Sequence, residues 1–213
     1  MPTKRFNNLD SERKKTILDA ARQEFVSKGF RDASLNGIIK NAGISKGSLY
    51  YYFEDKSDLY LTVMDEVFGE IYGLPDEFLN DLSCENFWSA FEAHTVMNMR
   101  YAQENPDVVV LSRDLVTLTE SPHASEAMAD FYAKIQDMYT ELFKKGLTLG
   151  AVRDDIPLEL ILSIIIHMGA ALDYFVFERW DDYSPEELNS YAIKYSDMVK
   201  KIASPESKEG GEV

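Results

Sequence analysis

Hydrophobic and polar residues alternate along this chain mostly with the period of an α-helix. Apolar positions recur three and four residues apart, and the runs are separated by Gly, Pro or a residue that can cap a helix. The predicted helices begin near residues 11, 35, 46, 56, 87, 106, 122, 157 and 185. One short run, Val108-Val109-Val110, is ambiguous between helix and strand. The pattern therefore predicts an all-α protein of about nine helices.

Two short predicted helices near the N-terminus are joined by a tight turn. Ser34 can cap the first helix, Gly43 supplies the left-handed residue that ends it, and Ser45 can cap the second. Two capped helices joined in this way match a helix-turn-helix, whose second member lies in the major groove of DNA. The turn therefore predicts a three-helix DNA-binding domain joined to a larger helical body by the helix that begins near residue 56.

A helical wheel separates the side chains of the second short helix into two faces. Leu49, Tyr52 and Phe53 lie on the side that is predicted to pack on the preceding helices. The opposite side carries Gly47, Ser48, Tyr50 and Tyr51. Because glycine costs roughly 1 kcal/mol relative to alanine inside a helix, such a face is unusual for a merely solvated helix and favours a contact surface. On these residues alone, an aromatic core with Gly47 as a packing contact remains an open alternative.

The charge of the chain is unevenly distributed. The net charge is −15, but residues 1–56 hold eleven Lys and Arg against seven Asp and Glu, while residues 57–213 hold eleven against thirty. Because exposed charges are screened beyond about 8 Å at physiological salt, a basic end can bind a polyanion although the body is acidic. We therefore expect a DNA-binding domain with a flexible leader at 1–56, an effector-binding and dimerisation domain at 57–203 with a linker helix at 57–74, and a disordered tail at 204–213.

The N-terminal region resembles the TetR-like (tetracycline-repressor) family of bacterial transcription regulators. The resemblance rests on ILDAARQEFVSKGF (17–30), the Ser34 cap, AGISKGSLYYYF (42–53) and DKSDLY (55–60). It implies phosphate contacts from Ser34, Ser45, Tyr51 and Lys56, and contacts to base edges from Lys46, Gly47, Ser48 and Tyr50. Three positions depart from the usual family pattern, namely Gly37, Ile39 and Tyr52.

The function implied by the resemblance is sequence-specific regulation of transcription. We expect a cytoplasmic homodimer that binds a double-stranded DNA operator as a repressor and is released by a small-molecule effector. The alternatives are a DNA-anchored adaptor whose acidic domain binds a protein partner and, third, an enzyme of the larger domain. No phosphate loop, nucleophile elbow or HExxH motif is present, so no catalytic residue is assigned. With Cys84 as the single cysteine and no long uncharged apolar stretch, we expect no metal, no cofactor and no membrane span.

Aromatic and sulfur-containing side chains in the body are candidates for an effector pocket, although most of them are equally suited to an ordinary core. The candidates are Phe87, Phe91, His94, Met97, Tyr101, Met128, Phe131, Tyr132 and His167. The helix that begins at Pro157 is apolar nearly all the way round and must be covered on every side, which favours a four-helix bundle with a second copy. The interface residues predicted on it and on the last helix are Leu158, Ile161, Ile165, Leu172, Tyr191 and Tyr195. Burial within one large monomer core is the alternative.

Overall fold

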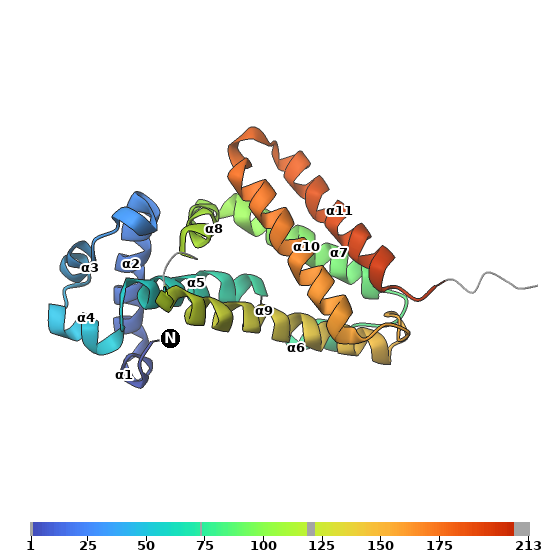
Figure 1. Cartoon of the computed structure of the whole chain (residues 1–213), viewed down its shortest axis with the longest axis horizontal. Helices are drawn as coiled ribbons and strands as arrows, with labels where there is room; N and C mark the ends of the chain where they lie inside the picture. Colours follow the sequence, from blue (N-terminus) through green and yellow to red (C-terminus); the bar gives the residue numbers. More distant parts are fainter. Residues whose placement is uncertain (1, 73, 119–121, 207–213) are drawn as a thin grey trace, which may run out of the picture. The chain divides into compact units, whose positions relative to one another are not determined.

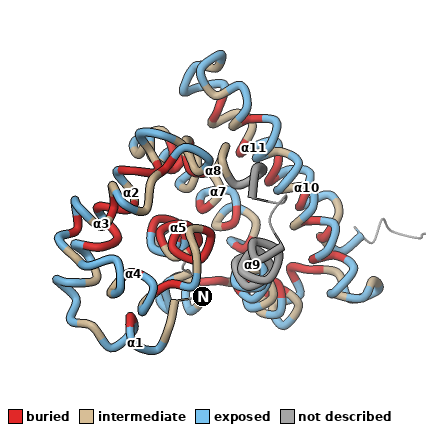
Figure 2. The backbone as a smooth tube through the Cα atoms, turned by 60° about the vertical axis from the view of Figure 1, so that its left-hand side comes forward, coloured by how far each residue is buried: buried red, intermediate tan, exposed pale blue. Residues whose placement is uncertain are grey.

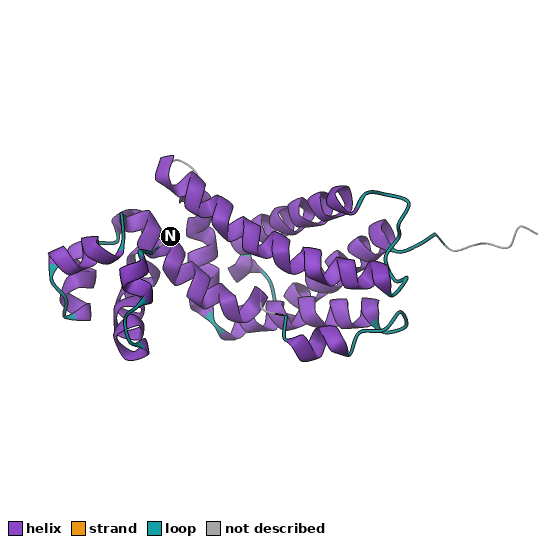
Figure 3. Ribbon diagram, turned by 90° about the horizontal axis from the view of Figure 1, so that it is seen from below, coloured by secondary structure: helices purple, strands orange, loops and turns teal. Residues whose placement is uncertain are grey.

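The protein is all-helical throughout the part of the chain that the structure describes (Figures 1 and 3). The computed structural model describes residues 2–72, 74–118 and 122–206, with side chains for 2–69, 74–114 and 132–206. Its helices are α1 (Lys4–Asn7), α2 (Ser11–Asp32), α3 (Leu35–Ala42), α4 (Lys46–Tyr52), α5 (Lys56–Tyr72), α6 (Asp76–Asn80), α7 (Phe87–Glu104), α8 (Pro106–Leu118), α9 (Pro122–Thr148), α10 (Leu158–Glu178) and α11 (Pro185–Ala203), with a 3-10 turn at Trp180–Asp182.

The all-α prediction is confirmed, and the ambiguous run at Val108–Val110 lies inside α8. The nine expected helices are all present. The two further α-helices in the described residues are α1 and α6, which have four and five residues. Helices this short carry too few apolar positions to show a periodicity, so the hydrophobic pattern could not reveal them.

The described chain divides into two compact units. The first comprises residues 2–72 and 105–134, and the second comprises 74–104 and 135–206. The first unit therefore contains α1 to α5, α8 and the first part of α9. The expected boundary after residue 56 falls inside this unit, between α4 and α5, and it stays a prediction about function.

Helix α5 forms the centre of the first unit. Leu59, Tyr60, Val63 and Met64 are fully buried along it, as its tube shows for most of the described length (Figure 2). The Tyr60 hydroxyl donates a hydrogen bond of 2.6 Å to the carbonyl oxygen of Leu111 in α8. A buried phenol needs such a partner, so this contact joins α5 to α8.

Helix α8 is also tied to α2 at two points. Arg22 pairs with Asp107 at 2.8 Å, and the backbone N–H of Phe30 donates to the carboxylate of Asp114 at 2.6 Å. The second contact depends on Gly29, whose φ of 73° bends the chain near the end of α2. Glycine adopts this conformation without steric cost, so the bend can present the Phe30 N–H to α8.

The core of the second unit is built from α7, α9, α10 and α11. Helix α11 packs on both α7 and α10, and Phe91, Phe143, Ile165 and Tyr195 meet in one apolar cluster. Gly146 of α9 makes a close approach possible, because a Cβ there would lie 2.5 Å from Val152 and 2.7 Å from the ring of Phe87.

Helix α10 carries both buried and exposed apolar side chains. One face packs into the core of its unit, whereas the other leaves large apolar residues in solvent, namely Leu160, Ile164, Tyr174 and Phe175. By length and composition α10 is the one described helix that would suffice to cross a membrane, and only 22% of its most apolar window is buried. We name the outward set Leu160, Ile164, Tyr174 and Phe175 the outer face of α10.

The structure corrects three of the six residues predicted for a partner interface on α10 and α11, while Leu158, Leu172 and Tyr191 remain partly exposed. Ile161 and Ile165 are fully buried and Tyr195 is nearly so, all within the unit's own core. Leu158 and Leu172 pack against the same core, and Tyr191 makes edge contacts with Phe175 and Tyr183. Because neighbouring positions on α10 are equally hydrophobic, sequence alone could not tell the inner face from the outer one.

Candidate nucleic-acid interface

The turn between α3 and α4 is built by local capping. Ser34 accepts a hydrogen bond from the N–H of Gly37 at the start of α3. Gly43 has a φ of 61°, and the N–H of the following residue, Ile44, donates a hydrogen bond of 3.1 Å to the carbonyl oxygen of Ile39. Ser45 then caps α4 by accepting from the N–H of Ser48 at 3.0 Å. These contacts confirm the predicted helix-turn-helix.

The outward face of α4 is exposed as the helical wheel predicts. The side chains of Tyr50 and Tyr51 are 51% and 50% exposed, whereas Leu49 and Phe53 are buried. A Cβ added to Gly47 would meet no atom nearer than the Ser45 hydroxyl at 3.7 Å. Nothing within the described protein therefore requires glycine at this position. These observations overturn the alternative in which the tyrosines belong to a core and Gly47 is a packing contact.

The leader before α2 is folded onto the end of α4, which corrects the expectation of a flexible leader for this segment. Thr3 donates its N–H to the carbonyl oxygen of Tyr52 at 2.9 Å and its hydroxyl to that of Tyr51 at 3.1 Å. Phe6 is buried, and its ring lies 4.7 Å from that of Phe53. The leader therefore satisfies two carbonyls that the last turn of α4 leaves without an intrahelical partner.

This docking brings a further cation to the exposed face. The guanidinium carbon of Arg5 lies 3.9 Å from the centre of the Tyr51 ring. Arg5 and its neighbour Lys4 lie in the segment that was expected to be a flexible leader. Thr3 is a capping residue that could have indicated the start of α1, but no local signal indicates that the leader docks on α4.

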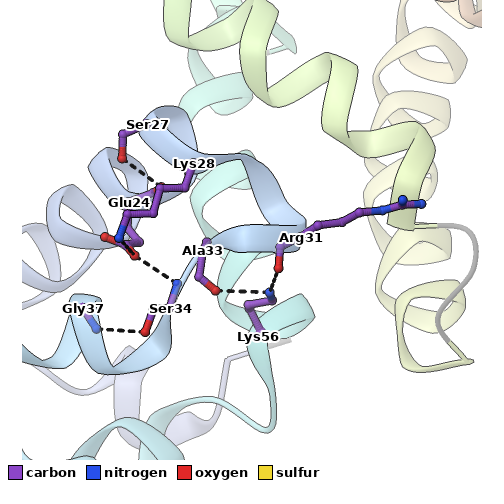
Figure 4. Close-up of polar contacts among 8 residues, drawn as sticks. All are labelled: Glu24, Ser27, Lys28, Arg31, Ala33, Ser34, Gly37 and Lys56. Atoms are coloured by element: carbon purple, nitrogen blue, oxygen red, sulfur yellow. Dashed lines mark hydrogen bonds and ion pairs between the residues drawn. The ribbon is translucent and has the colours of Figure 1, made fainter.

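Lys56 occupies a different position from the one expected of a phosphate ligand. Its ammonium group donates to the carbonyl oxygens of Arg31 and Ala33 at 2.9 and 3.2 Å, so two of its three donors cap the end of α2 (Figure 4). Burial lowers the pKa of Lys56, and nearby Asp32 opposes this shift. Lys56 thus joins the end of α2 to the start of α5, a role that its sequence position did not indicate.

Glu24 explains the unusual glycine in α3. Its buried carboxylate accepts from the Lys28 ammonium at 2.6 Å and from the backbone N–H of Ser34 at 3.0 Å (Figure 4). A Cβ on Gly37 would lie 2.9 Å from the same carboxylate. Gly37 therefore leaves room for an anion at the N-terminus of α3, where the helix dipole favours negative charge. The structure also accommodates the other two residues that depart from the usual family pattern: Ile39 is half-buried, and the ring of Tyr52 packs on that of Phe6.

Comparisons with known proteins agree with this geometry. The sequence profile described as "Bacterial regulatory proteins, tetR family" matches residues 17–63, which span α2 to α5 of the helix-turn-helix region. The chain is a TetR-like transcriptional regulator. Its first 72 residues contain the DNA-binding helix-turn-helix, and α4 is the recognition helix of this TetR-like regulator.

Named relatives extend the likeness beyond the helix-turn-helix. The HTH-type transcriptional regulator SrpR of Pseudomonas putida is 28% identical over 160 residues, 74% of this chain and 71% of SrpR. The HTH-type transcriptional repressor AcnR of Corynebacterium diphtheriae is 22% identical over 78% of this chain and 80% of its own length. The solved structure of the transcriptional regulator FadR from Bacillus subtilis with stearoyl-CoA has the same fold, with a TM-score of 0.70, 13% identity, and coverage of 86% of this chain and 96% of FadR.

The predicted effector-pocket residues of this TetR-like regulator that the structure describes differ in their burial. Phe87 and Phe91 are core residues, and His94 is buried on α7, whereas Met97 and Tyr132 are exposed. His167 is exposed, and its Nδ1 lies 2.7 Å from the carbonyl oxygen of Ser163. Tyr101 is half-buried. The side chains of Met128 and Phe131 lie outside the described residues.

The chemistry of the described side chains gives no metal centre. Within residues 2–69, 74–114 and 132–206, no group of three or more His, Cys, Asp or Glu side chains is arranged to hold a metal ion. The relatives named above are regulators of transcription.

Proposed function

We propose that this TetR-like regulator is a repressor that binds an operator through α4 as a homodimer and leaves it when a small-molecule effector binds the second unit. One observation carries the proposal, namely the outward face of α4, where Gly47, Tyr50 and Tyr51 are exposed and Ser48 is half-buried on the second helix of a helix-turn-helix. Tyrosine hydroxyls can donate to phosphates and tyrosine rings can contact thymine methyl groups. The absent side chain at position 47 lets the helix approach the base edges closely.

The docked leader adds to the proposed DNA surface. Lys46 at the start of α4 and Arg5 beside its last turn are both exposed cations. Ser45 lies at the N-terminus of α4, where backbone N–H groups also favour phosphate oxygens, and the Ser34 hydroxyl caps α3. We therefore assign direct base contacts to Lys46, Gly47, Ser48 and Tyr50, and backbone contacts to Ser34, Ser45, Tyr51 and Arg5.

The outer face of α10 supports a homodimer. A row of large apolar side chains in solvent is unfavourable for a monomer, and the same face of a second copy would cover it through a two-fold axis. A single helix-turn-helix reads one half-site, and two related by symmetry can reach successive major grooves roughly 34–36 Å apart. The interface proposed here uses Leu160, Ile164, Tyr174 and Phe175 in place of Ile161, Ile165 and Tyr195, which are buried in the core of their unit.

Two helices are suited to transmit effector binding to DNA. Helix α5 begins directly after the recognition helix, and α8 is joined to α2 and α5 by Asp107, Asp114 and the Tyr60–Leu111 hydrogen bond. Along the chain α8 follows α7, which belongs to the second unit, across Asn105 alone. An effector that favours one position of α7 would thus act on the DNA-binding unit through α8, with a typical coupling of about 1–3 kcal/mol.

The descriptions of two similar proteins support the repressor and effector parts of the proposal. AcnR is described as a transcriptional repressor, and FadR of Bacillus subtilis was solved with stearoyl-CoA. A regulator that binds the bacterial chromosome acts in the cytoplasm, which is where we place this protein. No cofactor enters the proposed mechanism.

The proposal is tested by selecting fragments of the host genome on the purified protein. We expect one or a few enriched fragments, each with a symmetric site that the protein protects from cleavage, and reduced transcription in vitro from the neighbouring promoter. Failure to enrich any fragment, or unchanged or increased transcription from a bound promoter, would contradict it. The same promoter assay, repeated with extracts of host cells, tests release by an effector.

A further inference from the structure

Two polar side chains lie on one face of α7 in the second unit. His94 and Asn98 are four residues apart, which places them one helical turn from each other. The His94 side chain is only 7% exposed, and its ring lies 5.7 Å from that of Phe78 in α6. This is an apolar setting for an imidazole and an amide.

The pair satisfies only half of its own hydrogen-bonding capacity. Nδ1 of His94 lies 3.4 Å from Nδ2 of Asn98, at the long end of a hydrogen bond. The remaining two atoms, Nε2 of His94 and Oδ1 of Asn98, are buried and have no hydrogen-bond partner in the described protein. Each such atom typically costs about 1–3 kcal/mol. Buried polar atoms of native proteins are nearly always hydrogen-bonded, so these two atoms are candidates for contact with a bound water or a ligand.

The pair presents one donor and one acceptor whichever way its protons are arranged. If the Asn98 amide donates to Nδ1, then Nε2 carries the proton and donates, and Oδ1 accepts. If the amide is flipped, Nδ1 donates to Oδ1, so that Nε2 accepts and Nδ2 donates. Burial lowers the pKa of His94, so the imidazole is neutral at neutral pH.

We propose that His94 and Asn98 recognise the polar group of the effector, and that the effector is an apolar molecule carrying a neutral group that both donates and accepts, such as an amide, an alcohol or a phenol. The inference rests on the proposed function, because it names the ligand class of the same effector site. A carboxylate fits poorly, since it offers acceptors only and would bring a charge to a neutral, buried pair. An amide or a hydroxyl offers both the donor and the acceptor that the pair requires.

Two matched series of small molecules test the proposal on the full-length protein. One series is benzamide, benzyl alcohol, benzoate and toluene, and the other is octanamide, 1-octanol and octanoate. Binding is measured by titration calorimetry and by the shift in melting temperature. We expect the amide and alcohol of at least one series to bind the wild-type protein at least about tenfold more tightly than the carboxylate or hydrocarbon, which corresponds to one completed hydrogen bond.

The variants Asn98→Leu and His94→Phe each replace one of the two polar side chains by an apolar side chain of similar size. We expect both to abolish the preference for amide and alcohol and to raise or maintain the melting temperature of the free protein, because an unsatisfied polar group is lost. Glu92→Gln, an exposed change on the same helix, is the matched control and should bind like the wild type. Because the probe ranking in the wild type needs no variant, it remains a test if a variant fails to fold.

Three outcomes would overturn the proposal, namely tightest binding by the carboxylates, no binding by any member of either series, or an unchanged ranking in both apolar variants. All four proteins are also tested on the selected operator without probes. Retained operator binding together with a failed ranking rejects this inference alone. Loss of specific binding in the wild type rejects the proposed function itself.

Discussion

The guanidinium of Arg5 lies 3.9 Å from the centre of the Tyr51 ring, so the leader and the recognition helix form one exposed surface. Two hydrogen bonds from Thr3 to the last carbonyls of α4 hold the leader in place. An arginine stacked on a tyrosine keeps its N–H groups at the rim of the ring, where they remain able to meet phosphate oxygens. We therefore propose that the DNA-binding surface begins before the helix-turn-helix itself.

Arg5→Ala is expected to weaken binding to operator and to unrelated duplexes by the same factor. Phosphate contacts carry no sequence information, and each one contributes about 0.9 to the slope of log K against log salt. Fluorescence anisotropy at several salt concentrations should show a slope that is smaller by about 1, with a change in stability of at most about 1 kcal/mol. A variant with wild-type salt dependence would place Arg5 outside the DNA interface.

Lys56→Met is expected to lower the free energy of unfolding by about 1–3 kcal/mol, because hydrogen bonds from a charged group to two carbonyls are lost. Denaturant unfolding followed by circular dichroism measures this change. Lys40→Met, at an exposed position of α3, is the control and should alter stability by at most about 0.5 kcal/mol. Equal stability of the two variants would contradict the structural role of Lys56 and favour the phosphate contact that the sequence predicts.

The carboxylate of Glu24 predicts a pH dependence of stability. The hydrogen bond from Lys28, together with that from the Ser34 N–H, lowers the pKa of Glu24 from its usual value of 4.5. A lowered pKa in the folded state stabilises the protein above the unfolded-state value, and this stabilisation is lost as the pH falls through the folded-state pKa. Glu24→Gln should therefore be less stable than the wild type at pH 7, and the difference should shrink when unfolding is measured below about pH 4.5. A difference that does not change with pH would contradict this account.

Ile164→Glu is expected to convert the dimer to a monomer without unfolding it. Ile164 is 42% exposed on the outer face of α10, and a two-fold axis would bring two added carboxylates close together. Sedimentation velocity should report half the wild-type mass, and operator affinity should fall because one half-site is read alone. Met97→Glu, at an exposed apolar position on α7, is the control and should remain dimeric. Unchanged mass in Ile164→Glu would exclude this face as the interface.

Local signals in the sequence were sufficient for most of the fold and for the recognition helix. Caps such as Ser34 and Ser45 and the left-handed Gly43 act within a few residues, so the sequence shows them directly. The exposed face of α4 followed from its helical period, because its apolar positions all fall on one side.

Features that depend on distant contacts could not be predicted in the same way. The role of Lys56 depends on carbonyls more than twenty residues earlier in the chain, and a single Phe6 in a polar leader shows no period. Helix α10 is apolar all round, so Leu160 and Ile161 are equivalent by hydrophobicity although one is exposed and the other buried. Long-range packing decides such cases, so the sequence could not show that Ile161, Ile165 and Tyr195 lie in the core of their own unit.

The most direct measurement of the central claim compares Gly47→Leu with Gly69→Leu for both stability and operator binding. Both glycines lie in helices at exposed positions, and a Cβ at Gly69 would meet nothing within 4 Å while one at Gly47 would meet only the Ser45 hydroxyl. Each substitution should therefore stabilise the free protein by roughly 0.5–1 kcal/mol. If α4 lies in the major groove, Gly47→Leu weakens specific operator binding at least about tenfold while Gly69→Leu leaves it unchanged. Equal operator affinity in the two variants would contradict the claim that this face of α4 contacts DNA.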